Sequence, residues 1–258
     1  MRAFEHGRFC WHDLATPDVD AARRFYGALF GWTADDREMG DGRTYTVFSD
    51  GETEVAGAYA PGPEFGEVPA HWTSYVAVDD VDRAVEQAEA LGGRLCFGPV
   101  DADDIGRMAA VTDPTGAAIA LWTERRKADA PVVPPRPGRF CWDELATRDV
   151  PAARLFYSEL LGWTAVEREM PSGKYTLFTR GDEMRAGALG MTDEWGDIPP
   201  HWMAYVQVTD CDETARAADR HGGKVLVPPT DIPPVGRFAV LQDPSGAVFS
   251  VITFAAES

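Results

Sequence analysis

The sequence predicts an α+β chain built from two tandem copies of one domain, each copy containing two βαβββ modules. "GRFCWHDLATPDVDAARRFYGALFGW" begins at Gly7, and "GRFCWDELATRDVPAARLFYSELLGW" begins 131 residues later at Gly138. A second landmark, "HW", recurs 130 residues apart, at His71 and His201. A repeat this long is too large for a solenoid unit, so it indicates a duplicated domain.

Each copy follows the order strand, helix, strands, and then repeats that order. Residues 8–16 alternate between apolar and polar side chains, which predicts a strand. A helix follows over 17–31, where Asp18 lies at the start and Gly31 at the end. "DPTG" at 113 and "DPSG" at 243 carry turn residues in turn order. The other predicted elements of the first copy are a helix over 79–93 and strands over 43–50, 53–60, 71–78, 94–100, 106–113 and 117–123.

The two copies are separated by the segment "ERRKADAPVVPPRPG". Its prolines lack a backbone donor and favour extended chain, which is typical of a linker. We therefore predict a first domain over 1–123, a linker over 124–137 and a second domain over 138–258.

The composition excludes several classes of partner. The chain has 42 acidic and 24 Lys or Arg residues, a net charge of −18, which disfavours binding to nucleic acid. It has no apolar run of about 20 residues, so no membrane contact is expected. The first residues lack the apolar core of a secretory signal, and the four cysteines form no CxxC pair. We expect a cytoplasmic protein with reduced thiols.

The ordered motifs resemble the vicinal oxygen chelate superfamily, which includes glyoxalase I, extradiol dioxygenases and bleomycin-resistance proteins. The resemblance rests on "LATPDVDAARRFYGALFGW", "VAVDDVDRAVEQAEALGG" and "VTDPTGAAIALW", and on their counterparts in the second copy. It implies glyoxalase-like domains, each with a cup-shaped mixed β-sheet and helices outside. The tandem arrangement with "FCW" openings looks like actinobacterial two-domain members labelled hydroxylases or antibiotic-biosynthesis proteins. Two domains in one chain would then give a monomer that mimics a dimer, or a homodimer.

The resemblance also implies where a divalent metal ion would be bound. Metal-dependent members hold an ion that acts as a Lewis acid on two neighbouring substrate oxygens. Here the corresponding positions carry Trp11, Thr73 and Ala120 in the first copy, and Trp142 and Ser250 in the second. An indole nitrogen has no lone pair to offer, and alanine offers nothing. We therefore predict no metal site and no other cofactor.

The inward face of each cup is predicted to be aromatic with a few polar groups. Alternation along the strands places Trp11 and Trp142 inward together with other residues of the same face. Aromatic walls with a few convergent polar groups are typical of a small-molecule pocket for planar ligands. As an alternative, the two tryptophans simply fill the cup as core. The predicted ligand-binding residues are Phe9, Trp11, Asp13, His71, Tyr75, Trp122, Phe140, Trp142, Glu144, His201 and Tyr205.

The histidines at the strand starts are candidate catalytic residues. His71 with Asp13, and His201 with Glu144, would each form an acid–base couple if the side chains met. Alternatively, each histidine is a strand-end residue bonded to the preceding loop. Spacing alone does not choose between the two.

Three functions are consistent with these patterns. The first is a metal-free binding protein that holds an aromatic or polycyclic metabolite or antibiotic, for biosynthesis or resistance. The second is a glyoxalase-like lyase or isomerase, or a hydroxylase-type enzyme, that acts on a secondary metabolite. The third uses only the interface between domains, for oligomer contacts. Because fold alone does not define function, only the side chains at the site can distinguish these three functions.

Overall fold

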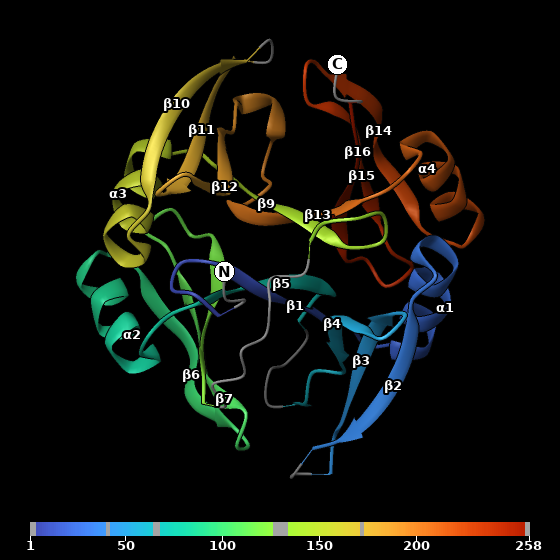
Figure 1. Cartoon of the computed structure of the whole chain (residues 1–258), viewed down its shortest axis with the longest axis horizontal. Coiled ribbons are helices and arrows are strands. Elements are labelled where there is room, and N and C mark those ends of the chain that lie inside the picture. The colour runs from blue at the N-terminus through green and yellow to red at the C-terminus, as the bar shows by residue number, and fades with distance from the viewer. Residues whose placement is uncertain (1–3, 40–41, 64–67, 126–133, 171–172, 256–258) are drawn as a thin grey trace. The chain divides into compact units, whose positions relative to one another are not determined.

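The computed structural model describes residues 4–39, 42–63, 68–125, 134–170 and 173–255, so most of the predicted linker lies outside the described residues. In the first copy the elements are β1 (Phe9–Ala15), α1 (Val19–Phe30), β2 (Thr33–Glu38), β3 (Thr44–Asp50), β4 (Thr53–Tyr59), β5 (His71–Ala77), α2 (Val81–Ala90), β6 (Arg94–Ala102), β7 (Gly106–Thr112) and β8 (Ala118–Glu124). In the second copy they are β9 (Phe140–Thr147), α3 (Val150–Leu161), β10 (Thr164–Met170), β11 (Gly173–Arg180), β12 (Glu183–Gly190), the short 3-10 helix η2 (Asp193–Trp195), β13 (His201–Gln207), α4 (Cys211–Arg220), β14 (Lys224–Ile232), β15 (Gly236–Gln242) and β16 (Val248–Phe254) (Figure 1).

The strands form two eight-stranded sheets with the same order in both copies. The first is β2-β3-β4-β1-β5-β8-β7-β6 and the second is β10-β11-β12-β9-β13-β16-β15-β14. β1 pairs with β4, and β5 with β8, in parallel, while the hairpin strands pair antiparallel. The predicted α+β class with mixed sheets is therefore confirmed. β2 was not among the expected segments, because its polar, largely exposed sequence "TADDRE" lacks a strand's alternation.

The helices begin and end where their capping residues predict. The carboxylate of Asp18 accepts a hydrogen bond from the backbone nitrogen of Ala21, and Gly31 ends α1 in the left-handed conformation. Asp149 and Gly162 do the same for α3. None of the helices in the described ranges is long and apolar enough to span a membrane.

The compact units of the chain do not coincide with the sequence copies. One unit comprises Met1–Cys10, Thr73–Val133 and Trp142–Met203; the other comprises Trp11–Trp72, Pro134–Cys141 and Ala204–Ser258. Each unit thus combines one βαβββ module of the first copy with one of the second. We call them unit 1 and unit 2.

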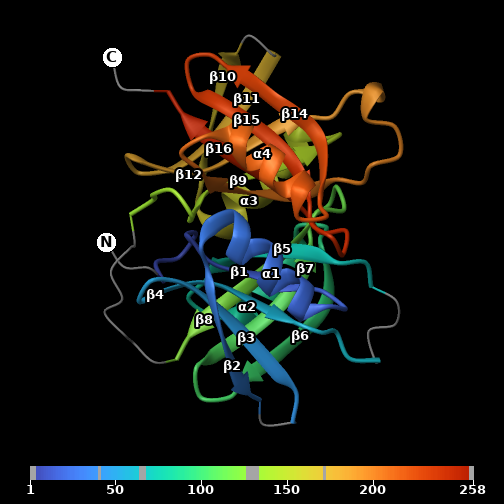
Figure 2. The ribbon, with the colours of Figure 1, turned by 90° about the vertical axis from the view of Figure 1, so that its right-hand side faces the viewer.

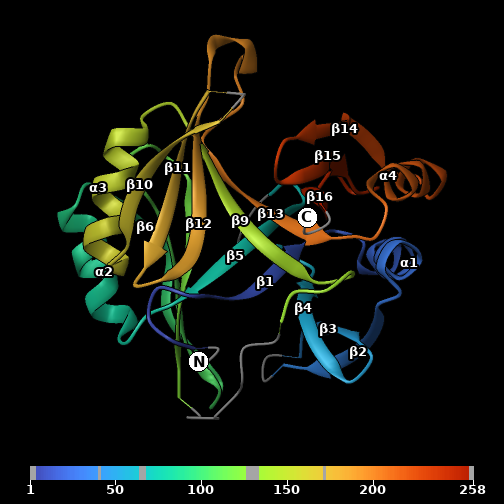
Figure 3. The ribbon, with the colours of Figure 1, turned by 45° about the horizontal axis from the view of Figure 1, so that its top comes forward.

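In unit 1, the modules that contain α2 and α3 share one core. The two helices pack side by side (Figure 3). The phenol of Tyr157 donates to the Asp113 carboxylate (3.0 Å) and accepts from the indole of Trp202 (2.8 Å). The indole of Trp163 donates to the carbonyl oxygen of Gly7 (2.8 Å). Residues of the first copy are therefore hydrogen-bonded to residues of the second within this unit.

Unit 2 repeats this arrangement with the copies exchanged. α1 packs beside α4 (Figure 2). Tyr26 donates to Asp243 (3.1 Å) and accepts from Trp72 (2.9 Å). Trp32 donates to the carbonyl oxygen of Gly138 (2.7 Å). The repeated "FY", "GW", "HW" and "DPxG" motifs are thus the residues that join a module of one copy to a module of the other.

The DPxG aspartates form the predicted turns and a second contact besides. One carboxylate oxygen of Asp113 accepts hydrogen bonds from the backbone nitrogens of Thr115, Gly116 and Ala117. Its other oxygen accepts the tyrosine phenol described above. The turn prediction is confirmed, and the buried tyrosine contact explains why an aspartate at 2% exposure is satisfied there.

Candidate functional site

In unit 2, Trp11, Asp13 and Tyr45 form a hydrogen-bonded group that we call the Trp11 array. Trp11 and Asp13 lie two residues apart on β1, and Tyr45 lies on β3. The indole Nε1 donates to Asp13 Oδ1 (2.8 Å) and to the Tyr45 hydroxyl (2.7 Å). The Tyr45 hydroxyl in turn donates to Asp13 Oδ1 (2.6 Å). Asp13 is only 6% exposed, and these two donors stabilise its negative charge.

A glycine on the neighbouring strand makes room for the Trp11 array. Gly57 on β4 pairs with Asp13 on β1 and with Val47 on β3. A Cβ at this position would lie 1.8 Å from the Tyr45 hydroxyl and 2.3 Å from Asp13 Oδ1. The neighbours Ala56 and Ala58 point to the other face, into the core beneath α1. The absence of a side chain at Gly57 therefore allows the array to form on the face away from the helix.

The phenols near Asp13 are held in their protonated form. Burial, followed by the Asp13 charge, raises the pKa of Tyr45 well above its usual value. The same two causes, in the same order, raise the pKa of Tyr59 on β4 to about 12. Because a phenol next to a buried carboxylate resists ionisation, Tyr45 stays a hydrogen-bond donor at neutral pH.

In unit 1, Trp142, Glu144 and Tyr175 form the equivalent group, the Trp142 array. Trp142 Nε1 donates to the Tyr175 hydroxyl (3.0 Å), and this hydroxyl donates to Glu144 Oε2 (2.8 Å). A Cβ at Gly187 on β12 would lie 1.7 Å from the Tyr175 hydroxyl. Burial, followed by the Glu144 charge, raises the pKa of Tyr175 strongly. Both copies therefore place indole, phenol and carboxylate in one hydrogen-bonded group.

Two predicted wall residues lie elsewhere. Phe9 packs in the unit 1 core, with its ring centroid 5.9 Å from Trp163 and 5.3 Å from Trp202. Phe140 stacks on His12 in unit 2, with centroids 3.9 Å apart, and packs against that core. Both phenylalanines thus contact the cores, and their part in a pocket stays a prediction. Each is the first residue of its strand, where the ring turns into the core although strict alternation would place it beside the tryptophan.

The histidines adopt the strand-end alternative. Nδ1 of His71 lies 2.8 Å from the carbonyl oxygen of Pro69, and Nδ1 of His201 lies 2.8 Å from that of Pro199. The described contacts of the two imidazoles are thus to the loops that precede their strands. These contacts fit the strand-end alternative, and the acid–base couples stay a prediction.

The remaining predicted residues lie in the second βαβββ module of their copies. Tyr75 on β5 and Tyr205 on β13 are buried, and each pairs with a small residue of the neighbouring parallel strand. Trp122 on β8 is half-buried and donates to Glu124 (3.2 Å). Gly106 on β7 leaves room for the Trp122 ring, because a Cβ there would lie 2.3 Å from it.

The residues at the family's metal positions do not fit a divalent ion. The indole nitrogens of Trp11 and Trp142 already donate to phenol or carboxylate oxygens and have no lone pair for a metal. Among the described residues, no group of three or more His, Cys, Asp or Glu side chains lies in a position to hold one. What these positions offer instead is hydrogen-bond donors and ring surface.

A surface depression of about 410 Å³ lies in unit 2 away from the Trp11 array. It is lined by residues at the start of α1 and of β3, among them Asp18, Arg23 and Thr46. The Arg23 guanidinium is already bonded to Asp36 and Thr46. The guanidinium in this depression is therefore already bound by neighbouring side chains.

Comparison with known proteins identifies the family. The sequence model of the Glyoxalase/Bleomycin resistance protein/Dioxygenase superfamily matches residues 8–121 and again 139–251. The chain therefore belongs to this superfamily, with two tandem glyoxalase-like domains, as the motifs predict.

Relatives extend over almost the whole chain. The chain is 40% identical over 252 residues to "Putative glyoxylase CFP32" of Mycobacterium tuberculosis, covering 96% of this chain and 95% of the relative. It is 39% identical over 266 residues to "Anthracycline biosynthesis protein DnrV" of Streptomyces peucetius, covering 98% and 95%.

Solved structures share the fold. A Mn(II)-bound glyoxalase from Novosphingobium aromaticivorans matches with a TM-score of 0.64 at 15% identity, covering 96% of this chain and 82% of that one. The 2,3-dioxygenase LapB from Pseudomonas sp. KL28 matches with a TM-score of 0.63 at 14% identity, covering 97% and 93%. At these identities the likeness shows the fold and not the reaction.

Sequence reasoning missed the two tyrosines that complete the arrays. Tyr45 lies in "RTYTVF" and Tyr175 in "GKYTLF", at matching places of the two copies. The small residues Gly57 and Gly187, in "VAGA" and "RAGA", were the second available signal. A glycine inside a strand often marks a close approach of another group, here the tyrosine hydroxyl.

Proposed function

We propose that the chain is a metal-free binding protein that holds an aromatic or polycyclic small molecule on the Trp11 and Trp142 arrays. The observation that carries this proposal is the indole–phenol–carboxylate group, whose indole stands in both copies at a position where the family binds its metal. A ligand with a planar ring and hydroxyl or amino groups would stack on the rings and donate to the carboxylate.

The half-burial of Trp11 and Trp142 supports this role over simple core filling. Both rings retain exposed surface, whereas Trp32 and Trp163 in the cores are only 5% and 3% exposed. The Asp13 carboxylate is further supported by two donors, so it is already positioned before a ligand arrives. Such preorganisation reduces the entropy lost on binding.

The names of the relatives point in the same direction. One relative is named as an anthracycline biosynthesis protein, and anthracyclines are polycyclic. A delivery, sequestration or resistance role in the metabolism of such a compound fits an aromatic site without metal ligands. The acidic composition fits a cytoplasmic protein that does not bind nucleic acid.

Titration with alizarin, a planar dihydroxyanthraquinone, tests the proposal through quenching of tryptophan fluorescence. We expect saturable quenching at micromolar concentration, with Trp11→Phe and Trp142→Phe each weakening one binding event about tenfold. Trp195→Phe, on η2, is the matched control and should leave the affinities unchanged. If neither array variant alters the titration, the arrays are not the binding sites.

A glyoxalase-like lyase or isomerase, or a hydroxylase-type enzyme, is the second candidate function. It is favoured by the relative named as a glyoxylase and by the buried Asp13 carboxylate, which is a possible general base. Asp13→Asn separates the two functions. An enzyme that uses this carboxylate would lose turnover while it still binds substrate, whereas a binding protein would change only in affinity.

A further inference from the structure

Tyr59 on β4 stands next to the Trp11 array in unit 2, on the same face of the sheet. It lies directly opposite Tyr45 in the antiparallel pair of β3 and β4. The register of this pair is regular from Tyr45 to Phe48 and shifts only after Phe48, so Tyr59 shares the face of Gly57, two residues before it. On that face a Cβ at Gly57 would meet Tyr45 and Asp13. The Tyr59 side chain therefore adjoins the array.

The Tyr59 phenol is a hydrogen-bond donor without a partner in the described part of the chain. Its ring is half-buried, and the influences on it are burial and the charges of Asp13 and Arg43, with no hydrogen bond among them. By contrast, the Tyr45 phenol accepts from Trp11 and donates to Asp13. Since a polar group that is partly withdrawn from water gains from a partner, Tyr59 is the phenol beside the array that a ligand can engage.

The backbone on both sides of Tyr59 holds this phenol in place. β4 lies between β3 and β1 in the sheet, and Tyr59 pairs with Tyr45 on one side and with Ala15 on the other. The carbonyl oxygen of Tyr59 also accepts from the backbone nitrogen of Thr16 (3.0 Å). A donor that is positioned before the ligand arrives reduces the entropy lost on binding.

The charge of Asp13 restricts the kind of acceptor that Tyr59 can serve. Burial, followed by this charge, raises the pKa of Tyr59 to about 12, so the phenol keeps its proton at neutral pH. Arg43 acts in the opposite direction and is the smallest of the three causes. A second anion beside a buried carboxylate is disfavoured, because like charges repel at short range. The acceptor that fits is therefore neutral, and a carbonyl oxygen on an aromatic ring is such an acceptor.

The second copy has an apolar side chain at the corresponding position. Leu189 lies opposite Tyr175 in the pair of β11 and β12, as Tyr59 lies opposite Tyr45. Leu189 is half-buried as well, so the two positions share their strand pairing and burial. They differ in the hydroxyl group, which only the first copy places beside its array.

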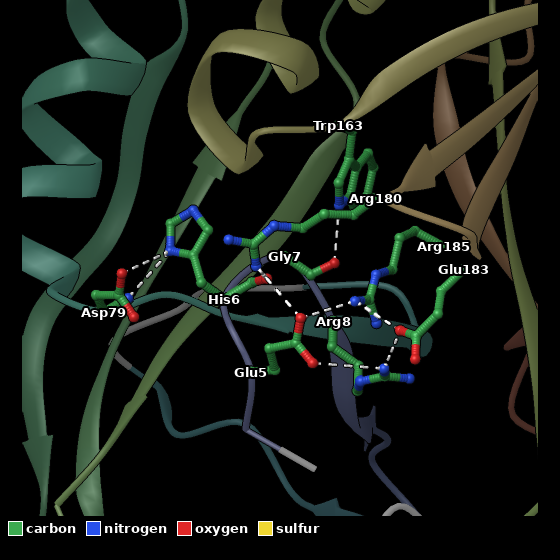
Figure 4. Close-up of polar contacts among 9 residues, drawn as sticks. All are labelled: Glu5, His6, Gly7, Arg8, Asp79, Trp163, Arg180, Glu183 and Arg185. Atoms are coloured by element: carbon green, nitrogen blue, oxygen red, sulfur yellow. Dashed lines mark hydrogen bonds and ion pairs between the residues drawn. The ribbon is translucent and has the colours of Figure 1, made fainter. Parts of the chain in front are cut away.

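The charged residues at the start of β12 form ion pairs of their own (Figure 4). Nη2 of Arg185 lies 3.0 Å from Glu5 and 2.8 Å from Glu183. Arg185 also lies where the register of β11 and β12 shifts. These ion pairs join the start of β12 to the segment before β1, whereas Leu189, near the end of β12, is the residue that lies opposite the array tyrosine.

We propose that Tyr59 donates a hydrogen bond to a carbonyl oxygen of the aromatic ligand on the Trp11 array, and so determines which ligands this array prefers. The inference rests on the proposed binding function and adds the acceptor group of the ligand. The ligand ring lies on Trp11, and its carbonyl oxygen accepts from the phenol. The Trp142 array, with Leu189 at the matching place, makes no such distinction.

Equilibrium dialysis with two neutral naphthalenes of similar shape, 2-acetylnaphthalene and 2-ethylnaphthalene, tests the proposal, because only the first has a carbonyl oxygen. The full chain carries Trp142→Phe in this experiment, so that the tighter binding event reports the Trp11 array. We expect Tyr59→Phe to weaken binding of the acetyl compound about fivefold and to leave binding of the ethyl compound unchanged. The substitution removes one hydrogen bond and keeps the ring.

The reciprocal exchange, Leu189→Tyr, is the matched variant. In a chain that carries Trp11→Phe, it should tighten binding of the acetyl compound at the Trp142 array about fivefold, again without a change for the ethyl compound. Urea denaturation of Tyr59→Phe should give the free energy of unfolding of the unsubstituted chain, so that a change in affinity reports binding and not folding.

Unchanged affinity of Tyr59→Phe for the acetyl compound would overturn the role of Tyr59 while the proposed function stands. An equal loss for both compounds would assign Tyr59 to ring packing and reject the hydrogen bond. Absence of a gain in Leu189→Tyr would reject the claim that this position sets the preference. If neither compound binds the unsubstituted chain, the proposed function fails as well.

Discussion

The Trp11 and Trp142 arrays are built from the same three residue types, yet they differ in the length of the acid. Asp13 accepts from both the indole and the phenol, whereas the longer Glu144 accepts from Tyr175 while the Trp142 indole donates to that phenol. The charge on the neighbouring strand differs as well, since the second copy has Arg185 where the first has Val55. The comparison indicates that duplication kept the three residue types of the array while their hydrogen bonds diverged.

The largest effect should come from the tyrosines that make the two units equivalent. Tyr26→Phe and Tyr157→Phe each remove the partner of a buried indole and of an aspartate oxygen. We expect each to lower the free energy of unfolding by about 2 to 4 kcal/mol. Urea denaturation measures this loss. Tyr59→Phe is the control, and a marked difference between the two main variants would show that the units are not equivalent in energy.

Next in size is the effect of filling the space that each array needs. In Gly57→Ala and Gly187→Ala the new methyl group would meet the tyrosine hydroxyl. We expect alizarin binding at the altered array to weaken about tenfold, and stability to fall by about 1 to 3 kcal/mol. Gly190→Ala, whose Cβ would lie 3.8 Å from the nearest heavy atom, is the matched control. Unchanged binding in both array variants would mean that the tyrosines are dispensable.

A smaller effect should distinguish the two carboxylates by the phenols they influence. Asp13 raises the pKa of both Tyr45 and Tyr59, whereas Glu144 raises that of Tyr175. In Asp13→Asn, we expect the pKa of Tyr59 to fall below its value of about 12 and that of Tyr45 to fall as well. Nuclear magnetic resonance of tyrosines labelled with carbon-13 at Cζ follows each phenol. A Tyr59 pKa that does not move would contradict the electrostatic contact with Asp13.

The smallest effect concerns Asp50, which stands in the first copy where Arg180 stands in the second. Burial tends to raise the pKa of Asp50, but its bonds to Arg139 and Arg136 outweigh burial and lower it below 3.8. The ion pairs of Asp50 therefore stabilise the fold at pH values above the pKa that Asp50 has in the unfolded chain. This stabilisation is lost as the pH falls through the lower pKa that Asp50 has in the folded chain.

Asp50→Asn should accordingly cost about 1 kcal/mol at neutral pH and less as the solution is acidified. Urea denaturation at a series of pH values measures this trend. Asp82→Asn, which removes a more exposed partner of Arg107, should show a weaker trend. A loss for Asp50→Asn that does not depend on pH would point to packing instead of charge.

The sequence predicted the fold because duplicated motifs, capping residues and turn residues are local signals. It did not predict that each compact unit combines modules of both copies. The sequences of the "FY" and "DPxG" motifs do not indicate whether the tyrosine of one copy contacts the aspartate of the same copy or of the other. Only the long-range bonds from Tyr157 to Asp113 and from Tyr26 to Asp243 distinguish these cases.

The candidate site was predicted in part. Alternation placed Trp11 and Asp13 on one face, and the structure shows them hydrogen-bonded to each other. It gave no sign that Phe9 and Phe140, at the strand starts, pack against the cores. Tyr45 was missed because the sequence around it does not indicate that the side chain of this residue on β3 reaches Trp11 on β1.

The bonds from Trp163 to Gly7 and from Trp32 to Gly138 bear on how this chain would respond to cutting. Cleavage between the repeats would give two fragments, each with half of two different cores and therefore with large apolar surfaces. Such fragments are natural candidates for complementation, in which mixing restores what neither part has alone. Each repeat of this single polypeptide supplies part of both cores, so neither core is complete without the other repeat.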